Sequence, residues 1–342
     1  MTNKTKINRL FSVAPMMAWT DRHCRYFHRL ISPSSLLYTV MITSGALKHG
    51  DAAFHLDYND DYEPPVALQL GGSEPQEMAM AAKLGGQWNY DEININCGCP
   101  SERVQKGAFG ACLMAEPNLI KECVSAMRQE TDKEITVKTR IGIDNQDSYE
   151  FLVEFIEQAA KGGCESFTIH ARKAWLKGLS PKENRDIPPL HYDRVYKLKQ
   201  DFPELEIIIN GGIKTIDEMQ EHIKQCDGVM VGREAYSNPW LLKDVEEQLF
   251  KNKVIKTKLQ IVEEMAIYAQ KEIDEGRAQL KDIARHMLGL YQNCAGAKAW
   301  RRTLSTKVYE EPTNVQILID AAQEVEQAII KRAQEYPETS AA

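Results

Sequence analysis

The sequence predicts an α/β protein, a (β/α)8 TIM barrel with a C-terminal all-α domain. Short and continuously apolar segments alternate with longer segments whose apolar residues recur at helical spacing. Continuous rather than alternating apolarity is expected of parallel strands that are covered on both faces. Strand signals stop near residue 250, and only helical periodicity follows. These observations predict a barrel followed by a helical domain.

Eight strands and six helices carry this prediction, and strand–helix alternation requires parallel pairing through crossovers. Eight such units close into a barrel. An open doubly wound sheet is the alternative, but the G-x-G-x-x-G motif that would favour it after the first strand is absent. The strands are expected at 11–14, 36–40, 66–70, 92–97, 134–141, 166–170, 206–210 and 228–232, and the helices at 21–31, 75–84, 117–130, 149–161, 215–225 and 239–250.

Glycine and proline justify most of the strand ends, because glycine weakens a sheet interior and proline cannot donate to its hydrogen-bond ladder. The first strand stops at Pro15, and the stretch 92–97 runs into Gly98 and Pro100. The strands at 66–70 and 206–210 each end at a glycine pair. Beyond residue 251, apolar residues recur at helical spacing in 259–269, 280–291 and 315–329. We therefore place a barrel domain at 1–245 and a helical domain at 246–342.

Composition bounds the function. A chain of 342 residues can hold a barrel of about 250 residues and one further module. Its net charge of −7 argues against a nucleic-acid partner unless basic residues cluster locally. No apolar run is long enough for a transmembrane helix, and Met1 to Arg9 lack the apolar core of a signal peptide, so we expect no membrane association and a cytoplasmic location.

The eight cysteines predict free thiols rather than disulfides, because they are scattered and only Cys97 and Cys99 lie close together. These two thiols with the distant Cys112 match none of the usual iron–sulfur spacings, so we expect no metal cluster. Polar residues collect at the ends of the predicted strands. These residues are Gln69, Asn96, Lys138 and His170. Taken singly, each could be a core residue whose hydrogen bonds are satisfied, with Lys138 paired to a carboxylate. Taken together, they indicate a pocket at one mouth of the barrel.

The last two strands indicate a phosphate site. Asn210-Gly211-Gly212 and Gly232-Arg233 follow strands seven and eight, where barrels commonly bind phosphate. Glycines let backbone N–H groups approach the oxygens, although glycines can also simply end strands. With Pro15-Met16-Met17, Gln69, Lys138 and His170, the set suggests a flat phosphorylated cofactor, for which flavin mononucleotide (FMN) fits best.

Several motifs together resemble the tRNA-dihydrouridine synthases. They are Pro15-Met16-Met17, the stretch from Asn94 to Ser101, Lys138-Thr139-Arg140, His170-Ala171-Arg172 and Asn210-Gly211-Gly212. The stretch from Lys173 to Arg185 resembles the A-type subfamily. The resemblance covers nearly the whole chain. It implies an FMN enzyme that uses NADPH to reduce uridines at positions 20 and 20a of the tRNA D-loop.

The resemblance also implies roles for individual residues. The proton donor of the family falls on Cys99, next to proline, rather than on Cys97. The FMN contacts fall on Pro15, Met16, Met17, Gln69, Lys138, His170, Asn210, Gly211, Gly212, Gly232 and Arg233. The tRNA contacts fall on Asn96, Lys182, Glu183, Arg185, Lys298 and Arg301. We expect a monomer.

The chemistry is consistent with these roles. Reduction of the uracil C5=C6 bond needs a hydride at C6, which reduced flavin can deliver from N5, and a proton at C5. A thiol is mostly protonated at neutral pH and can act as the general acid. Lys138 near the flavin ring could stabilise negative charge on it, and Cys97 is expected to pack as a small apolar group.

Two basic segments can offset the negative net charge: Arg172 to Arg185 after strand six, and Lys298 to Lys307 in one helix, either of which could instead be a solvated charged face. Two other functions stay open at this point. A flavin barrel acting on a free pyrimidine or an enone would share the mouth without needing the helical domain. A non-catalytic RNA-binding protein would carry no flavin.

Overall fold

The structure is a computed structural model that describes residues 7–59, 61–253 and 256–336. Two compact units divide the chain. The first comprises the chain up to Thr20 and Ser34–Gly232, and the second comprises Asp21–Pro33 and the chain from Arg233 onward. The sequence places the boundary at residues 245 and 246 instead. The difference arises because α1 (Arg22–Ile31), α10 (Arg233–Ser237) and α11 (Leu241–Gln248) pack with the C-terminal helices.

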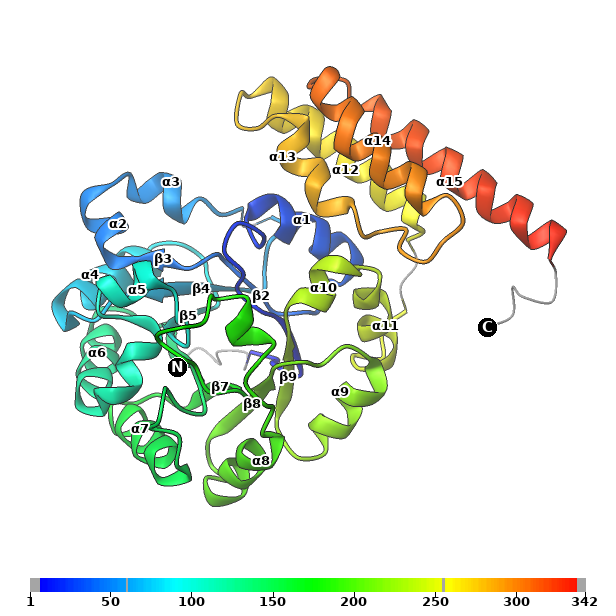
Figure 1. Ribbon diagram of the computed structural model, residues 1–342. Coiled ribbons are helices and arrows are strands. Elements are labelled where there is room, and N and C mark those ends of the chain that lie inside the picture. Colours follow the sequence, from blue (N-terminus) through cyan, green and yellow to red (C-terminus); the bar gives the residue numbers. More distant parts are fainter. Residues whose placement is uncertain (1–6, 60, 254–255, 337–342) are drawn as a thin grey trace. The chain divides into compact units, whose positions relative to one another are not determined.

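The first unit is the predicted (β/α)8 barrel (Figure 1). All of its strand pairs are parallel, and the order β1-β9-β8-β7-β6-β5-β4-β2 follows the chain around the barrel. The circle closes through a parallel bridge between Ser12 and Leu36. The strands are β1 (Phe11–Val13), β2 (Leu37–Tyr38), β3 (Ile42–Thr43), β4 (Val66–Gly71), β5 (Glu92–Cys97), β6 (Glu134–Arg140), β7 (Ser166–His170), β8 (Glu206–Asn210) and β9 (Gly228–Val231).

Helices surround the strands, as Figure 1 shows for α4, α6, α7 and α8. The predicted helix over 117–130 is confirmed at both ends, with Pro117 at its first position. The one over 149–161 is confirmed too, and Ser148 caps it by accepting from the backbone N–H of Phe151. The first unit contains α2 (Ser44–His49), α3 (Ala52–Leu56), α4 (Pro75–Gly86), α5 (Glu102–Lys106), η1 (Gly110–Ala115), α6 (Pro117–Glu130), α7 (Tyr149–Lys161), η2 (Glu183–Arg185), α8 (Tyr192–Asp201) and α9 (Ile216–Ile223).

Among its described residues, the second unit contains helices joined by loops and no strand. Besides α1, α10 and α11 it holds α12 (Lys258–Asp274), α13 (Leu280–Ala284), η3 (Arg285–Met287), α14 (Ala297–Glu310) and α15 (Gln316–Glu335). Polar contacts fasten α1 inside it: Asp21, which caps α1, pairs with Arg285, and His23 Nδ1 lies 2.7 Å from the hydroxyl of Tyr268. None of the helices within the described part of the chain combines the length and apolarity that a membrane span requires.

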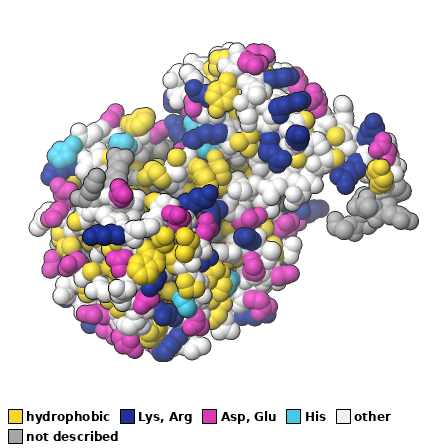
Figure 2. Space-filling model, in the orientation of Figure 1, with side chains coloured by type: hydrophobic (Ala, Val, Ile, Leu, Met, Phe, Trp, Pro, Cys, Tyr) yellow, Lys and Arg dark blue, Asp and Glu magenta, His cyan; other side chains and the backbone are white. Residues whose placement is uncertain are grey.

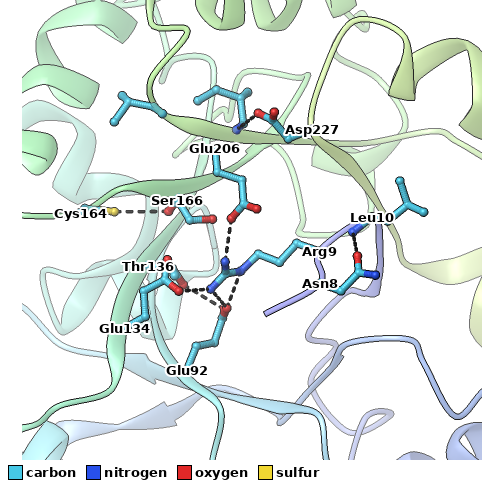
Figure 3. Close-up of polar contacts among 12 residues, drawn as sticks. Asn8, Arg9, Leu10, Glu92, Glu134, Thr136, Cys164, Ser166, Glu206 and Asp227 are labelled. Atoms are coloured by element: carbon cyan, nitrogen blue, oxygen red, sulfur yellow. Dashed lines mark hydrogen bonds and ion pairs between the residues drawn. The ribbon is translucent and has the colours of Figure 1, made fainter. Parts of the chain in front are cut away.

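An arginine joins three strands at the amino end of the barrel (Figure 3). The guanidinium of Arg9 lies 2.6 Å from a carboxylate oxygen of Glu92, 2.7 Å from Glu134 and 2.6 Å from Glu206. These are the first residues of β5, β6 and β8. Burial alone would lower the pKa of Arg9, but the three carboxylates raise it. Glu92 has no exposed surface, so its charge depends on this partner.

Replacing Arg9 should therefore destabilise the barrel. In Arg9→Met the buried charge of Glu92 loses its counterion, and we expect the free energy of unfolding to fall by about 3–5 kcal/mol. Lys48→Met is the matched control, because Lys48 pairs with Glu77 at the surface and such pairs contribute at most about 1 kcal/mol. Urea denaturation of both variants measures the difference, and equal losses would contradict a special role for the Arg9 cluster.

Candidate active site

Polar side chains of consecutive strands meet at the carboxyl end of the barrel. Gln69 of β4 pairs in register with Asn94 of β5, and Asn96 pairs with Lys138 of β6. His170 of β7 pairs in register with Asn210 of β8. The structure thus brings together the strand-end residues that the sequence singled out. In barrels of this type this end carries the chemistry.

A continuous line of hydrogen bonds runs from this end into the barrel interior. The backbone N–H groups of Gly98 and Cys99 donate to the Asn96 side-chain oxygen at 3.1 and 3.0 Å. The Asn96 amide donates to Gln69 Oε1 at 2.9 Å, and Gln69 Nε2 donates to Asn94 Oδ1, also at 2.9 Å.

The line continues to the amino end of the barrel. Asn94 Nδ2 donates to Thr136 Oγ1 at 2.8 Å, and the Thr136 hydroxyl donates to Glu92 Oε1 at 3.0 Å. Both ends impose the same direction, since backbone N–H groups can only donate and the carboxylate of Glu92 can only accept. No amide along the line can therefore turn over without breaking hydrogen bonds. We call Asn96, Gln69, Asn94, Thr136 and Glu92 the amide line.

The two neighbouring cysteines occupy different environments. Cys97 is fully buried, and burial raises the pKa of its thiol well above the ordinary value. Cys99 lies beyond the strand and is partly exposed, with its sulfur 3.5 Å from the hydroxyl of Ser101. Of these two thiols, that of Cys99 is the one accessible to a substrate, and Cys97 packs in the core as a small apolar residue.

Lys138 does not have the carboxylate partner expected of a structural lysine. Its ammonium donates to Asn210 Oδ1 at 3.1 Å, and no ion pair to it occurs among the described residues. Burial first, and the charge of Arg140 second, lower the pKa of Lys138 to about 7. The site therefore holds a cation that is poorly compensated by the protein and suited to meet an anionic or electron-rich ligand.

His170 carries a buried atom without a partner. Its Nδ1 makes no hydrogen bond within the described part of the chain. Burial and then the charges of Arg140 and Lys138 lower the pKa of His170 well below its ordinary value, so the imidazole is neutral near pH 7. A buried imidazole nitrogen with no partner is costly, which indicates a ligand that completes the site.

The glycines after β8 are required by conformation. Gly211 and Gly212 have φ of +117° and +77°, a region that favours glycine. A Cβ on Gly211 would lie 3.2 Å from His170 Nε2, so its backbone lies directly against that ring. A Cβ on Gly232 would lie 3.6 Å from the sulfur of Met16, which places Met16 beside the end of β9.

The remaining expected contacts are placed as follows. Pro15 and Met16 lie in the loop after β1, where the Met16 N–H donates to Thr20 Oγ1 at 2.9 Å. Met17 is 62% exposed. Arg233 is the first residue of α10 and belongs to the second unit. Within the described residues, no cluster of three or more His, Cys, Asp or Glu side chains could hold a metal ion.

Two side chains that the sequence analysis missed fasten the Cys99 loop to the loop after β7. Arg140 donates to the carbonyl oxygen of Gly98 at 2.9 Å and to those of Lys173 and Asn184 at 3.0 Å each. Gln105 Nε2 donates to the carbonyl oxygens of Pro100 and Leu176, at 2.7 and 2.6 Å. The Lys138-Thr139-Arg140 motif offered a signal for Arg140, whereas nothing in the sequence marked Gln105.

The loop after β7 presents its charged residues to solvent. Lys182, Glu183 and Arg185 are exposed, while Asn184 between them is fully buried. The Asn184 side chain accepts from the Trp175 N–H at 2.7 Å and donates to the Trp175 carbonyl at 2.9 Å, which fixes the loop. Hydrogen bonds from Ser180 lower the pKa of Glu183. Lys298 and Arg301 lie on α14 in the second unit, and both are exposed.

A closed barrel with a thiol, an amide set and an uncompensated lysine at its carboxyl end defines a barrel enzyme. The family model for dihydrouridine synthases (Dus) matches residues 12–334. The chain therefore belongs to the dihydrouridine synthase family, whose members are flavin-dependent oxidoreductases.

Curated relatives extend over nearly the whole chain. A protein of Vibrio vulnificus (strain CMCP6) named tRNA-dihydrouridine(20/20a) synthase is 57% identical over 320 residues, which are 93% of this chain and 97% of the relative. Proteins of the same name from Shewanella oneidensis and Escherichia coli O6:H1 are 52% and 54% identical. They cover 96% and 90% of this chain, and 98% and 93% of their own.

A solved structure supports the fold alone. The complex of 2-naphthoyl-CoA reductase with 2-naphthoyl-CoA aligns with a TM-score of 0.55 at 13% identity. The alignment covers 71% of this chain and 51% of that longer chain. At this identity the likeness carries no information on the substrate of the present chain.

Breaking the amide line should destabilise the barrel. In Asn94→Leu the buried Gln69 Nε2 loses its acceptor, and we expect unfolding to become easier by about 1–3 kcal/mol. Asn118→Leu is the control, because Asn118 is exposed and surface changes stay within about 0.5 kcal/mol. Urea denaturation compares them; a loss in Asn94→Leu no larger than in the control would show that the line is not needed.

The lowered pKa of Lys138 makes the stability of flavin-free protein depend on pH. Between its folded pKa of about 7 and its ordinary value of 10.5, the unfolded chain binds one proton more than the folded chain at this residue. The contribution of Lys138 to stability is therefore fully present above pH 10.5 and is lost as the pH falls to 7. We expect wild type to gain stability relative to Lys138→Met from pH 7 to pH 9, measured by urea denaturation. A constant difference would argue against the lowered pKa.

Proposed function

We propose that this protein reduces the C5=C6 bond of uridines 20 and 20a in the D-loop of tRNA, with FMN as its cofactor and NADPH as reductant. The observation that carries the proposal is the separation of roles at the barrel end, where Cys99 is accessible beside an uncompensated Lys138. Its relatives at 52–57% identity bear the name tRNA-dihydrouridine(20/20a) synthase, which supports the choice of substrate and positions.

The strand-end residues fit a bound flavin. The partnerless Nδ1 of His170 can meet a polar group of a ligand, and the ammonium of Lys138 can meet an anionic one. Gly211 and Gly212 leave their backbone open to a ligand, because glycine has no side chain. Bound FMN would supply the hydride for C6 of uracil. The residues expected to hold it are Pro15, Met16, Met17, Gln69, Lys138, His170, Asn210, Gly211, Gly212, Gly232 and Arg233.

Cys99 would provide the proton for C5. Its thiol can act as the general acid, a role worth about 10²- to 10⁴-fold in rate. Asn96 would keep the thiol in place, because its side-chain oxygen holds the backbone N–H groups of Gly98 and Cys99. The protonated form of Lys138 would balance negative charge that develops beside it.

The tRNA must present an extruded uridine, which costs a few kcal/mol and has to be offset by contacts elsewhere. We assign these contacts to Asn96, Lys182, Glu183, Arg185, Lys298 and Arg301. Lys182, Glu183 and Arg185 lie in the loop after β7. Arg140 and Gln105 join this loop to the loop of Cys99 by hydrogen bonds, so the same contacts position residues for tRNA binding and for proton donation. We further propose that the protein acts as a cytoplasmic monomer.

Replacing each of the two cysteines by alanine tests the mechanism. Cys99→Ala should keep its flavin absorbance and lose about 10²- to 10⁴-fold in dihydrouridine formation on unmodified tRNA. Cys97→Ala is the matched control and should keep nearly full turnover, because its thiol is buried away from the substrate. Dihydrouridine mapped by mass spectrometry reports the position. Full turnover in Cys99→Ala would reassign the acid, and equal activity on free uridine would reassign the substrate.

A further inference from the structure

Helix α14 presents a basic face to solvent. Its apolar residues Ala297, Trp300, Leu304 and Val308 are buried. On the exposed side, Lys298, Arg302, Ser305 and Tyr309 follow one another at spacings of three or four residues and so share one face about 16 Å long. Arg301 flanks this face, and the first acidic residue of the helix is Glu310. Figure 2 shows Lys and Arg side chains gathered over this part of the helical unit.

The charges of this face are not neutralised by the protein. Lys298, Arg301 and Arg302 form no ion pair with any described residue. Six other cations among the described residues of the second unit do pair with carboxylates, namely Arg22, Lys243, Lys256, Arg277, Arg285 and Lys331. In a chain with a net charge of −7, an unneutralised cationic face fits an anionic partner.

An exposed aromatic ring lies at the end of this face. The Tyr309 side chain is 61% exposed. Lys281 of α13 places its ammonium 5.9 Å from the centroid of the ring, over one of its faces. The opposite face of the ring is then the one available to a partner. Aromatic rings beside unneutralised cations are the combination that binds single-stranded nucleic acid, in which phosphates meet the cations and bases stack on the rings.

We propose that Tyr309 is a stacking platform for an unpaired nucleobase of the bound tRNA, with Lys298, Arg301 and Arg302 contacting the neighbouring phosphates. The inference rests on the proposed function, because it takes tRNA as the partner of the helical unit. It assigns a base contact to a helix for which the expected contacts, Lys298 and Arg301, are cations alone. Stacking on Tyr309 would recognise any unstacked base and would not discriminate between bases, because every base has a π-face.

Affinity and its salt dependence separate stacking from charge. The probe is an unmodified tRNA transcript with uridines in its D-loop, bound to full-length protein at several salt concentrations. Tyr309→Ala should weaken binding roughly 5- to 100-fold without changing the slope of log Kd against log salt, since stacking releases no counterion. Tyr309→Phe should stay within about twofold of wild type. Arg302→Ala should instead lower the slope by about 0.7 to 0.9.

Tyr336→Ala is the matched control, because Tyr336 is equally exposed, at 60%, and lies beyond the end of α15; it should bind like wild type. Wild-type affinity in Tyr309→Ala, or an equal loss in Tyr309→Phe, would overturn the stacking platform while leaving tRNA reduction intact. A wild-type protein that fails to bind the transcript would overturn the proposed function itself. Thermal melting of each variant confirms that the helix is folded.

Discussion

The amide line is the constraint on which the barrel end depends. Its direction is set at one end by backbone N–H groups of the Cys99 loop and at the other by a carboxylate held by Arg9. Each member is buried, so each broken hydrogen bond would leave a polar group without water. The hydrogen bonds that hold the loop of the thiol are thus continuous with those of Glu92 at the amino end, through Asn94 and Thr136, which touch no reacting group in the proposed mechanism.

The two ends of the barrel treat charge in opposite ways. At the amino end one guanidinium meets three carboxylates. At the carboxyl end the Lys138 ammonium meets an amide oxygen and no carboxylate of the described residues, and the neighbouring His170 is held neutral by burial and by nearby cations. Electrostatic attraction therefore stabilises the fold at the amino end, whereas within the described part of the chain no carboxylate neutralises Lys138 at the carboxyl end. Separating stability from function in this way is common in barrels of this type.

Sequence patterns predicted the barrel because both features of its strands, continuous apolarity and glycine ends, are local. The strand 206–210 was predicted at both bounds, as were the helices at 117–130 and 149–161. The helix over Tyr192–Asp201 was missed because it is mostly polar and buries few side chains. Strand-end residues such as Lys138 could be recognised in the sequence from their place in an apolar segment. The roles of Arg140, Gln105 and Asn184 could not, because they depend on contacts between loops that are far apart in sequence.

The membership of α1 in the helical unit has a consequence for dissecting the protein. The chain crosses between the units at Thr20–Asp21, at Pro33–Ser34 and at Gly232–Arg233, so the two modules are interleaved rather than strung in series. A fragment that stops at residue 232 would still carry α1, whose Phe27 and Ile31 have no exposed surface in the intact protein. Such a fragment would expose the apolar face of α1 to solvent and would be prone to aggregate. A fragment that contains only the barrel unit must also lack residues 21–33, with a short linker joining Thr20 to Ser34.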